Sequence, residues 1–107
     1  MKKQRSHITT FRQMALSFSG TAELPHFEKT SFRIHKKIFA TLDETNGIAC
    51  LKFTTDQQHQ FCLMSKAIYP VNNSWGKKGW TNIDLNIISE ELMAEALETA
   101  YKETLKT

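Results

Sequence analysis

The chain has 107 residues, of which 40% are hydrophobic and 23% are charged, and its formal net charge is +3 at pH 7. This length suits one domain with one core, and the composition excludes a largely disordered chain. No apolar run approaches the ~20 residues of a membrane span, and no apolar stretch follows the basic start MKKQRSHITTFRQ to make a signal peptide. We therefore expect one cytoplasmic domain over residues 1–107, flexible at residues 1–6, monomeric and away from membranes.

The first predicted element is a helix after Ser6, whose hydroxyl can cap the first turn. Apolar residues follow at helical spacing, namely Ile8, Phe11, Ala15 and Phe18, and Gly20 ends the helix. Between residues 22 and 53 the apolar period changes to that of strands, as in SFRIH at 31–35. DETNG at 43–47 predicts a hairpin turn in which Asn46 and Gly47 take positive φ angles.

A short second helix is predicted over residues 54–64. Thr55 and Gln58 have the spacing of a capping box, and the helix ends near Ser65. Its predicted buried side consists of Phe61, Cys62 and Met64. Residues 67–71 form a short edge strand marked by Pro70, residues 72–80 form a glycine-marked loop, and residues 81–88 are extended again.

The last predicted element is a long helix capped by Ser89. Glu90 and Glu91 lie at the positive end of its dipole, and Lys102 and Lys106 lie near the negative end. One apolar stripe places it across a core, namely Leu92, Met93, Ala96, Leu97, Ala100, Tyr101 and Leu105. The order of elements predicts a single two-layer α+β domain, in which an antiparallel sheet packs against N-terminal, middle and C-terminal helices.

Charge is distributed unevenly along the chain. Residues 89–107 carry two lysines against five glutamates, a net −3, whereas residues 1–88 carry twelve basic residues against six acidic ones, a net +6. A basic body with an acidic end favours an anionic partner on one side of the fold.

Three separated stretches support a family resemblance: ALSFSGTAELPHFEKTSFRIHKKIFATL at 15–42, LKF at 51–53, and WGKKGWTNIDL at 75–85 followed by an amphipathic helix. Together they closely resemble the MmcQ/YjbR family of small bacterial proteins, from about Phe11 to Tyr101. The resemblance implies a compact α+β fold similar to frataxin and secretion chaperones, and a family name that often includes "DNA-binding". Ser19, Glu28 and Thr30 depart from the family pattern, and Glu28 adds a negative charge.

The segment WGKKGW at 75–80 has two interpretations. In the functional one, Lys77 and Lys78 contact phosphates while Trp75 or Trp80 stacks on a base. In the structural one, which we favour for the tryptophans, they fill the end of the core, the glycines permit unusual backbone geometry and the lysines form a solvated tip.

The segment RIHKK at 33–37 is a second basic candidate. Arg33 and His35 face away from Phe32 and Ile34, and Lys36 and Lys37 form the turn into the next strand, so this hairpin can address a nucleic-acid groove. Side by side with WGKKGW it would make one patch, with a sixth charge from Lys29 or Arg12. The alternative is that these charges keep an exposed sheet soluble. Lys2, Lys3 and Arg5 have two interpretations, a flexible arm that adds phosphate contacts or, more commonly, a frayed charged end.

Nothing in the sequence completes a catalytic or metal site. His26 has no partner nucleophile or acid at recognisable spacing, so we interpret it as a structural histidine. Cys50 and Cys62 have apolar neighbours and no CxxC spacing, which predicts reduced thiols, and no metal or cofactor is expected; iron would need carboxylates that the first helix lacks.

We therefore expect a non-enzymatic protein that binds double-stranded DNA through a basic hairpin and loop. The residues predicted to carry this binding are Arg33, His35, Lys36, Lys37, Trp75, Lys77 and Lys78. The alternative is a module, similar to secretion chaperones, that binds another protein or a small ligand.

Overall fold

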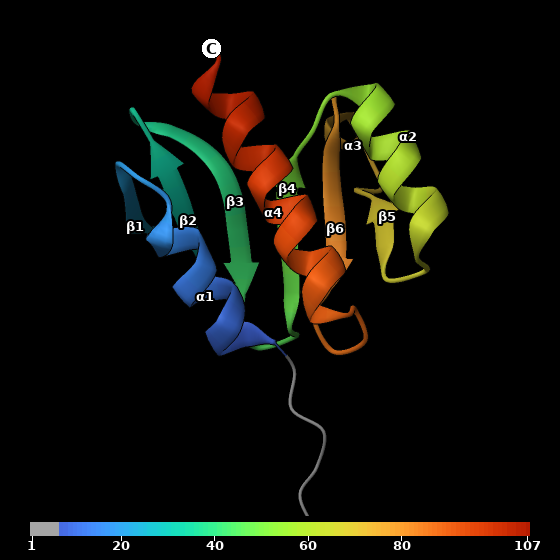
Figure 1. The fold of residues 1–107 in the computed structure, drawn as a ribbon, viewed down its shortest axis with the longest axis horizontal. Helices are drawn as coiled ribbons and strands as arrows, with labels where there is room; N and C mark the ends of the chain where they lie inside the picture. The colour runs from blue at the N-terminus through green and yellow to red at the C-terminus, as the bar shows by residue number, and fades with distance from the viewer. Residues whose placement is uncertain (1–6) are drawn as a thin grey trace, which may run out of the picture.

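The computed structural model describes residues 7–107, which form a six-stranded antiparallel sheet and four helices (Figure 1). In chain order the elements are α1 (Ile8–Ser17), β1 (Thr21–His26), β2 (Lys29–Ile34), β3 (Lys37–Asp43), β4 (Ile48–Lys52), α2 (Thr55–Met64), β5 (Ile68–Pro70), α3 (Ser74–Lys77), β6 (Trp80–Asp84) and α4 (Glu90–Leu105). The predicted α+β class is confirmed. The predicted cap Ser6 and the segment 1–6 lie outside the described residues.

Three of the helices, α1, α2 and α4, form a layer on one face of the sheet, and the short α3 lies apart from them behind β6. The strand order is β1-β2-β3-β4-β6-β5, and α4 crosses the sheet with α1 and α2 on either side of it (Figure 1). Within residues 7–107 no helix layer covers the opposite face, which we call the open face. This two-layer arrangement leaves one side of the sheet available for contacts with other molecules.

The strand register fixes which residues lie on each face, because side chains alternate along a strand. One row crosses the open face through all six strands, namely Leu24, Ser31, Thr41, Cys50, Asn82 and Tyr69. The adjacent row, Phe32, Ala40, Leu51 and Thr81, faces the helices and is buried. The open face is therefore mixed in polarity, whereas the helix-covered face is the core.

Aromatic side chains hold α1 and α4 against the sheet. Phe11 packs edge-on against Phe32 at 5.8 Å between ring centroids, and Phe18 stacks on Tyr101 at 4.6 Å. The Tyr101 hydroxyl donates to the Ser19 carbonyl at 2.7 Å. Burying one such ring contributes about 1.5–3 kcal/mol. The predicted stripe of α4 is confirmed except at Leu105, which is exposed because α4 extends past the core at its last turn.

Of the three predicted helix caps, Ser6 lies outside the described residues, Ser89 is confirmed, and the cap of α2 is shifted by one residue. Ser89 accepts from the Leu92 amide at 3.2 Å, as predicted for α4. In α2 the capping box uses Thr54 and Gln57 in place of the adjacent Thr–Gln pair predicted. Of the predicted buried side of α2, Phe61 is buried, Cys62 is half-buried and Met64 is exposed, because α2 covers only the edge of the sheet.

Two hairpin turns differ from expectation. Gly47 has the predicted positive φ of 70°, but Asn46 does not share it and its side-chain amide donates to Asp43 at 2.8 Å. The β2–β3 turn consists of His35 and Lys36, with φ of 53° and 69°, and Lys37 already belongs to β3. Two positive φ angles are the pattern of a type I′ turn, which normally takes Asn-Gly, so this turn is strained.

Candidate functional site

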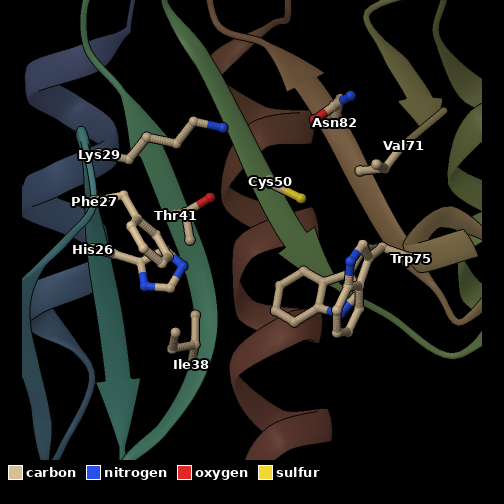
Figure 2. Close-up of a pocket in the computed structure, with 10 residues that line it drawn as sticks. His26, Phe27, Lys29, Ile38, Thr41, Cys50, Val71, Trp75 and Asn82 are labelled. Atoms are coloured by element: carbon tan, nitrogen blue, oxygen red, sulfur yellow. The ribbon is translucent and has the colours of Figure 1, made fainter. Parts of the chain in front are cut away.

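The open face contains a groove of about 610 Å³ between the β1–β2 turn and α3. Figure 2 shows the rings of His26 and Phe27 on one side of it and Trp75 on the other. Trp80, the first residue of β6 shortly after α3, also lines it. We call this feature the open-face groove. Concave sites with aromatic walls are the usual form of ligand-binding sites.

The groove floor comes from three neighbouring strands. Ile38 and Thr41 of β3, Cys50 of β4 and Asn82 of β6 all lie on it (Figure 2). Burial raises the pKa of the Cys50 thiol to about 11, so this thiol is neutral at pH 7 and offers an apolar surface. Among residues 7–107 no three His, Cys, Asp or Glu side chains cluster as a metal site requires.

The segment WGKKGW is a short helix followed by a tight turn, where we had predicted only a loop. The Asn73 side chain caps α3 by accepting from the Trp75 amide at 2.9 Å. A Cβ on Gly76 would lie 1.8 Å from the Val71 carbonyl oxygen, and one on Gly79, whose φ is 107°, would lie 1.9 Å from that of Phe53. The predicted unusual backbone angle is confirmed at Gly79 but not at Gly76, where glycine is required because the backbone of Val71 lies too close for a side chain.

Gln58 of α2 fixes this segment to the rest of the domain. Its side-chain amide nitrogen lies 2.9 Å from the Gly76 carbonyl oxygen, 3.1 Å from that of Trp80 and 3.1 Å from the Thr81 hydroxyl. The one-residue shift of the capping box leaves Gln58 free for these contacts. A helix on the covered side of the sheet thus holds a wall of the groove on the open side.

The tryptophans do not fill the core, and the favoured structural interpretation was wrong for them. Trp75 is 55% exposed, and Trp80 is half-buried on the open face because its neighbour Thr81 takes the inward position in β6. Each ring has a lysine amine close to its centre, Lys78 at 5.2 Å from Trp75 and Lys52 at 6.0 Å from Trp80. Such cation–π pairs keep positive charge beside exposed aromatic surface.

The remaining predicted residues lie around the β2–β3 turn. Arg33 is on the open face, where its Nε donates to the Ser31 hydroxyl at 2.9 Å, and His35 and Lys36 are exposed at the tip. The Lys37 amine instead donates to the Thr107 hydroxyl at 3.0 Å, beside the end of α4. Lys37 is therefore directed away from the open face.

The two predicted basic segments share one end of the sheet. Both β3 and β6 begin there and β4 ends between them, so Lys52 lies between the β2–β3 turn and α3. Arg12 is not available as a sixth cation, because its guanidinium forms ion pairs with Glu23 and Glu44.

The opposite end of the open face is more acidic. Asp43 and Asp84 flank Ile48 in one row across β3, β4 and β6. A hydrogen bond from Asn46 lowers the pKa of Asp43, and the charge of Lys29 lowers it further, so this carboxylate is ionised at pH 7. Positive potential is therefore concentrated at the end of the sheet that carries Trp75 and Trp80.

Sequence reasoning missed part of this site. Thr41, Cys50 and Asn82 meet only through the register of three strands, which no local pattern specifies. Lys52 and Phe27 also escaped notice; strand alternation places Lys52 on the face opposite Leu51, which was a usable signal.

No helix within residues 7–107 is long and apolar enough to span a membrane.

A comparison with curated proteins found no match. The fold resembles the crystal structure of Deinococcus radiodurans protein DR2400, with family-model domain DUF419, at a TM-score of 0.81 and 19% identity, covering 100% of this chain and 84% of that one. It also resembles a Pseudomonas syringae protein at a TM-score of 0.68 and 20% identity, covering 90% of this chain and 97% of that one.

These structural likenesses show the fold alone. The YjbR family model, in contrast, matches the sequence itself over residues 16–103, which include β1 to β6 and most of α4. The chain therefore belongs to the YjbR family.

Proposed function

We propose that this chain is a non-enzymatic nucleic-acid-binding protein that holds a polynucleotide against the open face of its sheet. The observation that carries the proposal is the pair of solvent-accessible tryptophans, each with a lysine amine within 6.0 Å of its ring centre. Exposed rings beside cations are the combination that stacks on bases while neutralising phosphates.

The proposed path of the phosphates passes five cations at this end of the sheet. They are Arg33, Lys36, Lys52, Lys77 and Lys78. Specific DNA-binding proteins make about 6–10 phosphate contacts, so this smaller number predicts modest, sequence-tolerant binding. Lys37 is left out of the proposed path because its amine contacts Thr107 beside the end of α4, away from the open face.

A salt titration of binding to a labelled oligonucleotide tests the proposal. Five phosphate contacts predict a slope of log K against log salt of about −3.5 for a single strand and about −4.5 for a duplex. Replacing Lys52 and Lys78 by Ala should reduce the size of that slope by about 1–2. The matched control is Lys102→Ala with Lys106→Ala, which removes the same charge from α4.

Equal loss of binding in both double variants would show that only net charge matters. Salt-insensitive binding, or none at low salt, would contradict the proposal outright. Normal slopes in the α4 variant with reduced slopes in the open-face variant would support it.

The size of the groove favours a second candidate, the binding of a small ligand. About 610 Å³ falls within the roughly 300–1,000 Å³ of small-molecule sites. A small uncharged aromatic compound that raised the melting temperature at high salt would favour this candidate over the polynucleotide.

A further inference from the structure

We infer that the open-face groove takes an unpaired nucleobase, so that the protein binds single-stranded in preference to fully paired nucleic acid. This inference rests on the proposed function and names the form of its ligand. Bases inside a duplex are stacked on both faces, and only an unstacked base can present its ring to a side-chain wall.

The walls of the groove carry the first part of the inference. Phe27 is 93% exposed and its φ is 60°, a conformation that bulky residues rarely adopt. Its ring packs edge-on against that of His26 at 4.9 Å, and both rings lie over the open face, across the groove from Trp75 (Figure 2). Aromatic surface on both sides of a hollow suits a flat ring between or against the walls.

The floor carries the second part. Thr41 and Asn82 flank Cys50 in one row across β3, β4 and β6, which places them about 10 Å apart at ordinary strand spacing. Within residues 7–107 neither side chain makes a hydrogen bond. The Asn82 amide therefore offers both a donor and an acceptor, which is the pairing that reads the edge of an exposed base.

Charge decides between possible occupants of the groove. Lys52 and Lys78 stand beside the tryptophan wall, and Lys29 lines the groove from β2. Cations on both sides of an aromatic hollow complement a ligand that alternates phosphates with flat rings. A polynucleotide strand has this alternation, whereas an apolar protein segment would leave the lysines without anionic partners.

The test compares one labelled twelve-nucleotide DNA strand with the same strand in a blunt duplex, at the same salt concentration, by fluorescence anisotropy and tryptophan emission. We expect the single strand to bind at least about tenfold more tightly and to quench the tryptophans, since stacking on one base contributes about 5- to 150-fold in affinity. A mononucleotide measured alongside should bind much more weakly, because it lacks the neighbouring phosphates.

Two variants separate the groove from the surrounding charges. Phe27→Ala should weaken single-strand binding by about fivefold or more, while Leu63→Ala, which truncates another exposed apolar side chain on α2, should leave it unchanged. Asn82→Leu should alter the ranking of dA, dC and dT homopolymers with the salt slope intact.

The failures of the two proposals are distinguishable. Two results would overturn the binding of a base in the groove and retain binding through the lysines. In the first, binding depends on salt but the duplex binds as tightly as the single strand or more tightly; in the second, binding depends on salt but Phe27→Ala and Asn82→Leu both have no effect. A mononucleotide that binds as tightly as the strand would replace the strand with a free nucleotide. A protein segment that binds at the groove while no nucleic acid binds would overturn both.

Discussion

Gly76→Ala sets helix propensity against backbone packing. Ala favours a helix interior over Gly by about 1 kcal/mol, so propensity alone predicts that the variant is more stable. The structure predicts the opposite, because the new methyl group would lie 1.8 Å from the Val71 carbonyl oxygen. Moving α3 away costs about 1–3 kcal/mol for the overpacked site, and lengthening the Gln58 contact to Gly76 costs about 1 kcal/mol more.

The net expectation for Gly76→Ala is a loss of about 1–3 kcal/mol in the free energy of unfolding. Urea denaturation followed by far-UV circular dichroism measures this loss. In thermal denaturation the melting temperature should fall by about 4–8 °C per kcal/mol for a domain of this size. Lys77→Ala, one residue further along the same helix, is the control and should change stability by less than about 0.5 kcal/mol. An equally stable or stabilised Gly76→Ala protein would refute the packing argument.

Three further predictions concern the turns and the support of the groove. Replacing His35 by Asn and Lys36 by Gly should raise the free energy of unfolding by about 1–2 kcal/mol, because the left-handed conformation suits the new residues. A lower free energy of unfolding, measured by urea denaturation, would contradict the claim that this turn is strained. Gln58→Ala should cost about 1–3 kcal/mol and broaden the tryptophan emission, since its backbone acceptors lose their donor; unchanged emission would argue against its role. Because its pKa is lowered in the folded state, Asp43 stabilises the fold above its unfolded pKa and loses that contribution as pH falls through the folded value. Asn46→Ala removes the hydrogen bond that lowers this pKa, so the NMR titration of Asp43 should shift to higher pH.

The fold was largely predictable because its signals are local. Ser89 with two following glutamates marks α4, Gly47 marks a hairpin, and Pro70 marks an edge strand. The errors were local as well. Thr54 and Thr55 each precede a Gln at capping-box spacing, and only the packing of α2 selects the first.

The candidate site was only partly predictable because it depends on pairing between distant strands. The lysines of WGKKGW and RIHKK were identifiable as charges, but the direction of Lys37 toward Thr107 depends on where α4 ends. The exposure of Trp75 and Trp80 depends on the open face having no helix layer, a property of the whole topology. The floor at Thr41 and Asn82 requires the register of β3, β4 and β6.

The most direct measurement is NMR chemical-shift mapping with a short single-stranded oligonucleotide at low salt. We predict the largest shifts for the indole NH groups of Trp75 and Trp80, the Asn82 side-chain amide, and the backbone amides of Arg33 and Lys52. Amides of α1 and α4 should change little, because these helices lie on the covered face. Shifts confined to the helix layer, or no shifts at concentrations that saturate anisotropy, would contradict binding at the open face.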